Sequence, residues 1–452
     1  MDAPSARPPL FSNKALVHLT IPIIIDALLA ILAGTVDAAM VSSAGEAAVS
    51  AVSLVDAINI LFISIFSSVA AGGAVITAQY IGSRNFDKAK TSSNQLLYAS
   101  TFLATLLMAL LLLFHAPLLR LIYGGIEQKV FENAKIYFSI TLLGYPFLAI
   151  GSSSNAVLRA MGKNRQAVTV TIIANAMNVI GNATLIYGFR MGVAGAAIST
   201  TFSRMVLAAL GLVLAHKKEL TARFHKLLRF RLDWDVMRRV LRVGLTNGME
   251  GGLFYVGKLL IASLVSGFGT IVIAADSVAQ TIANVGWTIV SGFGIVMLTV
   301  VGQCVGAGEP EQAKTYTKKL LVAAFIAMVT VFGSIFLLRH QLVQLFDFGP
   351  EALELAAYYT GICSLTPILS LYSLSFIPAN AFRAAGDIRY SVTLSLLSMF
   401  AFRVALCFLL NGIFPQLGVL CVYVGMFADW AFRAVMNIIR YRSGKWLQKK
   451  LI

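Results

Sequence analysis

Two acidic side chains, Asp26 and Asp37, stand within an apolar stretch, residues 18–44, that is long enough to cross a bilayer. A carboxylate at the centre of such a helix costs roughly 2.5–3.5 kcal/mol on insertion scales, so an acid there indicates function by default. Their spacing puts them within roughly 20° around an α-helix and about 16 Å apart along it. We expect both to face the protein interior, on a helix that Pro22 allows to bend. The alternative is that either acid is only structural, paired with a partner on another helix.

Buried carboxyl groups suit ion coupling, because burial disfavours the charged form and a bound proton or cation restores neutrality. The histidines lie near the ends of apolar stretches or in the polar middle of the chain, so a histidine relay is not expected. Asn178 and Asn182 are four residues apart on one predicted helix and share a face. We expect both at the depth of Asp37, as its partners in binding the coupling ion. The alternative is that they only join neighbouring helices.

The elements that must position these groups are membrane helices. The chain has 452 residues, of which 58% are hydrophobic and 12% charged, about half the charged fraction of a soluble domain. This predicts an all-α polytopic membrane protein. Twelve apolar spans are expected, at residues 15–43, 48–80, 92–116, 128–158, 166–189, 192–216, 237–267, 271–303, 316–339, 351–382, 390–412 and 416–440.

The basic residues predict the orientation of these spans. If the N-terminus is cytoplasmic, 27 Lys and Arg residues fall in cytoplasmic segments and four fall on the opposite side. We therefore expect N-in, C-in topology, with the protein in the inner membrane of a bacterium. The net charge of +16 then reflects basic residues beside anionic lipids, and no nucleic acid partner is implied. The four cysteines lack the spacing of a metal site.

An internal repeat divides the chain. QYIGSRNFDKAK (79–90) and RAMGKNR (159–165) align with QCVGAGEPEQAK (303–314) and RAAGDIR (383–389) at one offset of 224 residues. We expect two six-helix lobes, residues 1–216 and 237–452, joined by a cytoplasmic linker, residues 217–236. Because each half has an even number of spans, a pseudo-two-fold axis along the membrane normal should relate them, with substrate between them.

These repeated loops, together with GVAGAAIST (192–200), DWAFR (429–433) and RYRSGKW (440–446), resemble the multidrug and toxic compound extrusion (MATE) family, in particular its DinF-like branch. The resemblance covers essentially the whole chain. It implies a twelve-helix, two-lobe transporter with a central cavity that expels organic, often cationic, compounds in exchange for protons or sodium ions.

The resemblance also bears on the coupling residues. Asp37 fits the acid that the family carries in the outer part of the first helix, fifteen residues after the proline, here Pro22. The position of Asn182 is often Asp in the family, and this departure puts a two-carboxylate site in doubt. Some members have a further acid in the tenth helix, but residues 366–382 contain none here.

Candidates in the second half carry less information. Glu250 aligns with Asp26 through the repeat and lies among glycines that permit a bend, and Lys258 follows eight residues later. Arg403, Asp429 and Arg433 are expected to be structural, since Asp429 and Arg433 are four residues apart and can pair. Aromatic faces suit organic cations, so the candidates for a substrate cavity, with simple packing as the alternative, are Phe254, Tyr255, Trp287, Met297, Tyr372 and Phe376.

The function that the sequence favours is secondary active export by alternating access. Asp37 would couple to protons, with sodium as the alternative ion, and Asp26, Asn178 and Asn182 would assist. The chain shows no phosphate-binding loop, nucleophile constellation or metal cluster, so we expect no enzyme activity and no cofactor. The rival interpretations are a lipid-linked-saccharide flippase and a channel. We expect small organic substrates, contact with the bilayer and a monomeric chain.

Overall fold

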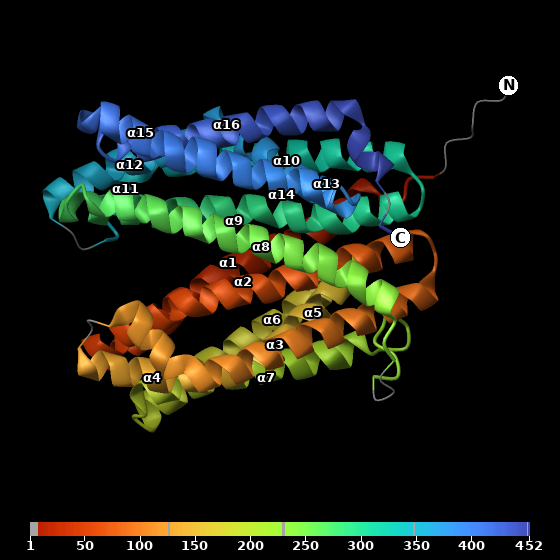
Figure 1. The fold of residues 1–452 in the computed structure, drawn as a ribbon, viewed down its shortest axis with the longest axis horizontal. Coiled ribbons are helices and arrows are strands. Elements are labelled where there is room, and N and C mark those ends of the chain that lie inside the picture. The colour runs from red at the N-terminus through yellow and green to blue at the C-terminus, as the bar shows by residue number, and fades with distance from the viewer. Residues whose placement is uncertain (1–7, 125–126, 228–230, 347–348, 450) are drawn as a thin grey trace. The chain divides into compact units, whose positions relative to one another are not determined.

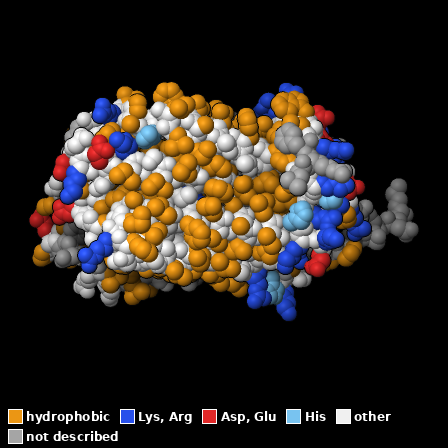
Figure 2. Space-filling model, turned by 90° about the horizontal axis from the view of Figure 1, so that it is seen from below, with side chains coloured by type: hydrophobic (Ala, Val, Ile, Leu, Met, Phe, Trp, Pro, Cys, Tyr) orange, Lys and Arg blue, Asp and Glu red, His pale blue; other side chains and the backbone are white. Residues whose placement is uncertain are grey.

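Every regular element that the structure describes is a helix. The computed structural model describes residues 8–124, 127–227, 231–346, 349–449 and 451–452. Within these ranges eleven helices are long and apolar enough to cross a membrane, and a bent pair that counts as one span makes twelve. The expected all-α polytopic fold is therefore confirmed. Figure 2 shows hydrophobic side chains across the middle of the face that it draws, with charged side chains gathered toward the two ends.

The helices form two compact units. The N-terminal unit comprises Ile25–Ile81 and Asn85–Gly252, and the C-terminal unit comprises Leu253–Ile452 together with Met1–Ile24 and Gly82–Arg84. The lobes expected from the sequence, 1–216 and 237–452, stay a prediction. The units differ from them chiefly in two helices, because the start of the first helix packs with the C-terminal unit and the start of the seventh span packs with the N-terminal unit.

Most helices of the N-terminal unit run side by side (Figure 1). They are α1 (Asn13–Ser42, from Ile25 onward), α2 (Glu46–Gly82), α3 (Phe86–Tyr123), α4 (Gln128–Leu143), α5 (Tyr145–Ala160), α6 (Asn164–Asn182), the π-helix η1 (Ala183–Gly188) and α7 (Gly192–Ala215). The helix α7 packs against α4, α5 and α6, and α3 packs against α4 and α5. Phe66, Phe138 and Tyr145 are buried at the centre of this core.

The expected span 128–158 is a bent helix pair. Helices α4 and α5 meet at Gly144 with a bend of 47°. A Cβ at position 144 would lie 2.9 Å from the side chain of Arg204 on α7. The glycine therefore leaves room for the half-buried side chain of Arg204 at the bend, where Tyr145 lies beside this arginine.

The expected linker, 217–236, is folded in the parts that the structure describes, while residues 228–230 lie outside the described residues. Asn94 on α3 donates to the carbonyl of His225 at 2.7 Å and accepts from its amide at 3.1 Å. Ser93 donates to the carbonyl of Ala222 at 2.8 Å. The linker is thus bound to the start of α3 by its backbone.

The C-terminal unit contains the remaining helices. They are α8 (Trp234–Ser266, from Leu253 onward), α9 (Thr270–Gly306), α10 (Pro310–Leu337), α11 (Arg339–Val343), α12 (Pro350–Leu369), α13 (Tyr372–Ala384), α14 (Ile388–Ser398), the π-helix η2 (Met399–Ala405), α15 (Leu406–Ile413), the 3-10 helix η3 (Pro415–Leu417), α16 (Leu420–Ser443) and the 3-10 helix η4 (Lys445–Gln448). The core of this unit lies around α9, which packs against α10, α12 and α13.

Two of the expected spans of this unit are interrupted. The span 351–382 is α12 followed by α13, and the break is at Leu371, whose φ of 57° is left-handed. The span 390–412 consists of α14, η2 and α15. The fifth span, α6 with η1, also contains a π-helix. Because the repeat relates the fifth span to the eleventh, a π-helix interrupts the equivalent helix of both halves, and π-helical turns frequently mark functional positions.

Candidate functional site

Asp37 and Asn182 meet inside the N-terminal unit. The Nδ2 of Asn182, the last residue of α6, donates a hydrogen bond to Oδ1 of Asp37 on α1. Asn182 is fully buried and Asp37 is half-buried. Among the residues that the structure describes, no basic side chain forms an ion pair with Asp37. A buried amide therefore holds this carboxylate without neutralising it.

Asn178 lies one turn before Asn182 but makes different contacts. Its Nδ2 is 3.4 Å from Oγ1 of Thr200 on α7, and its carbonyl accepts from Ser199 at 2.7 Å. The helices α6 and α7 thus approach closely at the level of Asn178. Asn182 contacts Asp37, and Thr200 and Ser199 contact Asn178, one helical turn before Asn182. The structure brings Asn182 to Asp37 directly, and it places Asn178 in the adjoining polar contact.

Asp56 on α2 belongs to a second polar group in the same unit. Its Oδ1 accepts from Nδ2 of Asn59 at 3.1 Å and from the hydroxyl of Tyr137 at 3.3 Å. Tyr145 donates to Oδ1 of Asn59 at 2.8 Å. Asn59 and both tyrosines are buried. Sequence reasoning missed these three residues, because tyrosines in apolar spans carry no signal of the partner that they will find.

Arg204 is a half-buried cation near these acids. Its Nη1 donates to the carbonyl of Thr141 at 3.0 Å, and its guanidinium lies 6.0 Å from the ring centre of Tyr145. Asp37 and Asp56 both interact with it electrostatically, although neither is within ion-pair distance. An arginine in a transmembrane span was a visible signal, since such residues mark functional or structural sites by default. This part of the unit therefore holds the carboxylates of Asp37 and Asp56 and the guanidinium of Arg204.

Asp26 has a different environment from Asp37. Its Oδ2 is 2.6 Å from Nη2 of Arg159, at the end of α5. The two side chains are 15% and 21% exposed, so this ion pair is largely shielded from water. Arg159 begins the RAMGKNR loop of the internal repeat, which gives that motif a structural role. Asp26 thus has a permanent counter-charge, whereas Asp37 has an amide.

The candidates on α8 fall in different units. Glu250 is buried in the N-terminal unit, and Lys258 is exposed in the C-terminal unit, where its Nζ lies 6.0 Å from the ring centre of Phe254. Glycines at positions 251 and 252 separate them at the point where the chain passes from one unit to the other.

Four of the six aromatic and apolar candidates gather around Trp430, a buried residue of α16. The ring centre of Trp430 is 4.9 Å from Tyr372, 6.2 Å from Trp287 and 6.3 Å from Phe376. Phe254 joins this group through the two arginines that contact its ring. Met297 is instead buried in the hydrophobic core, and Tyr255 is exposed.

The expected pairing of Asp429 and Arg433 is present, with Nε 2.7 Å from Oδ1. A further acid was missed, because Asp276 on α9 accepts from the hydroxyl of Tyr423 at 2.6 Å. The tenth span has no acid between residues 366 and 382, and Asp276 lies on the eighth span instead. Among the described residues, no three His, Cys, Asp or Glu side chains are grouped so that they could hold a metal ion.

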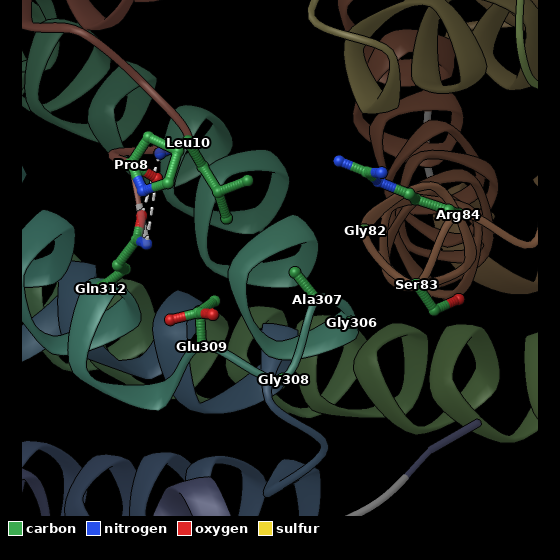
Figure 3. A pocket seen from close by; sticks show the side chains of 10 residues that line it. All are labelled: Pro8, Leu10, Gly82, Ser83, Arg84, Gly306, Ala307, Gly308, Glu309 and Gln312. Atoms are coloured by element: carbon green, nitrogen blue, oxygen red, sulfur yellow. Dashed lines mark hydrogen bonds between the residues drawn. The ribbon is translucent and has the colours of Figure 1, made fainter. Parts of the chain in front are cut away.

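A pocket of about 630 Å³ lies where the two repeated Q-x-x-G loops end. Figure 3 shows Arg84 on one side of it and Glu309 and Gln312 on the other. A Cβ at Gly82 would overlap the carbonyl oxygen of Gln303 on α9, so only glycine fits at this position of the C-terminal unit. None of the proposed coupling residues lines this pocket.

Comparison with known proteins identifies the family. A family model described as MatE matches the chain twice, at residues 22–184 and 249–409, nearly at the 224-residue offset of the repeat. The chain is 25% identical over 451 residues to the probable multidrug resistance protein NorM of Thermotoga maritima, covering 97% of this chain and 94% of that protein. It is 26% identical over 455 residues to the uncharacterized transporter YisQ of Bacillus subtilis, covering 98% and 97%.

The fold agrees with these matches. A solved structure described as an outward-facing conformation of a multidrug resistance MATE family transporter of the MOP superfamily superimposes with a TM-score of 0.89, at 21% identity and 97% coverage of both chains. The resemblance drawn from the repeated loops is confirmed, while the DinF-like branch stays a prediction. Since the family model matches well over half of the sequence, the chain belongs to the MatE family of membrane transporters and is not an enzyme.

Proposed function

We propose that this protein is a secondary active exporter that expels small organic, often cationic, compounds in exchange for protons by alternating access. The observation that carries this proposal is the contact between Asp37 and Asn182 in the interior of the N-terminal unit. A carboxylate at this depth is costly, so its presence indicates a functional role. In a transporter, that role is the binding of a coupling ion. The naming of relatives such as NorM and MepA as multidrug proteins supports the export of organic compounds.

The contrast between the two acids of α1 supports the choice of Asp37. Arg159 already neutralises Asp26, so a proton or sodium ion arriving there would have to displace a charge-assisted hydrogen bond of 2.6 Å. Asn182 is neutral, so the charge of Asp37 remains to be balanced by a mobile cation. Asp26 then positions α1 against α5, and Asp37 carries the coupling ion.

A proton is the coupling ion that we favour. Sodium prefers several oxygen ligands around it and usually a fixed negative charge. Asp37 faces the amide nitrogen of Asn182, and Arg204 adds a positive charge to the same interior. The amide nitrogen and the nearby guanidinium both disfavour a bound sodium ion. Neither prevents protonation of the Asp37 carboxyl group.

The conformational change would act through Pro22. A proline removes one helical hydrogen bond and permits a bend. The two compact units divide α1 between Ile24 and Ile25, within one turn after this proline, so the residues before and after that division pack with different units. Solved relatives described as MATE in the bent and in the straight conformation support a hinge of this kind.

The location and assembly that we propose follow from the sequence. The distribution of basic residues favours N-in, C-in topology in the inner membrane of a bacterium. We propose that one chain is sufficient for transport and that the two lobes, 1–216 and 237–452, move against each other.

Ion dependence in proteoliposomes tests this proposal. Purified protein should accumulate ethidium when a pH gradient is imposed without sodium, and a proton ionophore should abolish accumulation. A requirement for a sodium gradient at constant pH would replace the proton by sodium. Failure to accumulate an organic cation under any ion gradient would contradict export of such compounds by secondary transport.

A further inference from the structure

Three cationic side chains surround one aromatic ring in the C-terminal unit. The centre of the Phe254 ring lies 5.8 Å from Cζ of Arg403, 5.8 Å from Cζ of Arg433 and 6.0 Å from Nζ of Lys258. Arg433 also lies 5.0 Å from the ring of Phe376, and Arg403 lies 5.7 Å from that of Trp430. Two of the aromatic faces expected to receive an organic cation, those of Phe254 and Phe376, therefore lie against cations of the chain itself.

One carboxylate opposes these three charges. Asp429 is fully buried, and its Oδ1 accepts from Nε of Arg433 at 2.7 Å. Its Oδ2 lies 3.8 Å from Nη1 of Arg403, which is an ion-pair distance but too long for a hydrogen bond. Arg433 has two further acceptors on Ser395. The single negative charge of Asp429 can neutralise only one of the two guanidinium groups. Its hydrogen bond is to Arg433, so Arg403 has only the longer contact.

Arg403 is the unsatisfied member of the group. It is only 7% exposed, and no acceptor among the described residues lies within hydrogen-bond distance of its Nε. A buried charge without a hydrogen-bonded partner is strongly unfavourable, so such groups are rare without a function. Water could satisfy the donors, but it would not balance the positive charge.

Apart from Oδ2 of Asp429, which has no hydrogen-bond partner among the described residues, the neighbouring side chains add further unpaired donors. The indole nitrogens of Trp287 and Trp430 are buried, and neither has an acceptor among the residues that the structure describes. The two rings are 6.2 Å apart, edge to face. The half-buried rings of Phe254, Trp287, Tyr372 and Phe376 surround these donors with apolar surface. The cluster is thus rich in positive charge, N–H donors and aromatic surface.

We propose that this cluster binds the anionic group of an aromatic organic compound. The carboxylate or phosphate would accept from Arg403, with Lys258 providing a second positive charge at the exposed edge. The ring of the compound would pack against Trp287 and the neighbouring aromatic side chains. The proposal rests on the proposed export function and adds a chemical class of compound, aromatic anions, to the organic cations named there. Binding itself requires neither a gradient nor Asp37.

Calorimetry on the purified protein in zwitterionic micelles tests the proposal with three probes of one shape. Naphthoate is the anion, naphthamide is neutral, and naphthylmethylammonium is the cation. We expect naphthoate to bind about tenfold more tightly than either of the others, which is about 1.4 kcal/mol. Arg403→Gln should weaken naphthoate binding about tenfold, and Lys258→Gln should weaken it by a smaller factor.

Matched variants separate binding from folding. Arg403→Gln leaves Asp429 paired with Arg433, and Lys258 is exposed, so both variants are expected to fold. Lys319→Gln is the control, because Lys319 also lies 6.0 Å from an aromatic ring, that of Tyr316, in the same unit. It should bind naphthoate as wild type does. Equal binding of naphthoate and naphthamide, no binding of naphthoate, or unchanged binding in both Arg403→Gln and Lys258→Gln would overturn the proposal. None of these results would alter the test of proton coupling.

Discussion

Breaking the ion pair between Asp26 and Arg159 should destabilise the N-terminal unit without abolishing coupled transport. The two atoms are 2.6 Å apart, and the side chains are 15% and 21% exposed. Exposed pairs contribute about 0–1 kcal/mol, and removing one partner of a fully buried pair costs about 3–5 kcal/mol. The intermediate burial of this pair gives about 2 kcal/mol for either single variant, Asp26→Asn or Arg159→Gln.

A double-mutant cycle measures the pairwise interaction. Unfolding in mixed micelles by increasing amounts of sodium dodecyl sulphate, followed by far-ultraviolet circular dichroism, gives the free energy of unfolding of each variant. The double variant should lose about 2 kcal/mol, as each single variant does, because the second substitution removes a charge that is already unpaired. The coupling energy is then about 2 kcal/mol.

An exposed pair in the same unit provides the control for this cycle. Lys135 and Glu132 on α4 are 3.1 Å apart and 39% and 46% exposed, so their coupling energy should be at most about 0.5 kcal/mol. If the effects of Asp26→Asn and Arg159→Gln simply add, the pair does not hold α1 to α5. If Asp26→Asn also abolishes gradient-driven transport in folded protein, Asp26 carries the coupling ion instead.

Two further predictions concern regions outside the membrane interior. Cysteines introduced at positions 86 and 310 should react with an impermeant maleimide only from the cytoplasm, and a cysteine at 271 only from outside; the opposite labelling would reverse the topology. The hydrogen bond from Lys88, at 2.8 Å, holds the pKa of the Asp233 carboxyl below its ordinary value, so this carboxylate stabilises the fold at pH values above about 4. That contribution is lost as the pH falls through the lowered pKa. The difference in melting temperature between wild type and Asp233→Asn should therefore vanish in acid. A difference that persists in acid would exclude the Asp233 carboxylate as its cause.

The sequence predicted the helices well, because the length and apolar composition of each span are properties of the chain itself. The twelve expected spans correspond to eleven helices and one bent pair. The partner of Asp37 was also predictable, since Asn182 and Asp37 lie at similar depths of their spans. The π-helices were not predictable, because they depend on how neighbouring helices pack.

The partners of the buried charges could not be predicted for the same reason. The position of Arg159 in a basic loop predicts only a role in topology, yet this arginine pairs with Asp26. Arg403 was expected to be structural, and the pattern of residues cannot show that Asp429 satisfies Arg433 in preference to it. Which side chains on different helices meet depends on how each helix is rotated about its own axis. The residues of one helix alone do not determine that rotation.

The most direct test of the central claim is a comparison of gradient-driven and gradient-free transport by Asp37→Asn. In proteoliposomes without sodium, wild type should accumulate ethidium under a pH gradient and should also exchange labelled for unlabelled ethidium when no gradient is present. The variant should lose accumulation but retain exchange, because the neutral amide keeps the contact with Asn182 but cannot release a proton. Uphill accumulation by Asp37→Asn would show that another group couples transport to the proton gradient, and the mechanism proposed for Asp37 would be wrong.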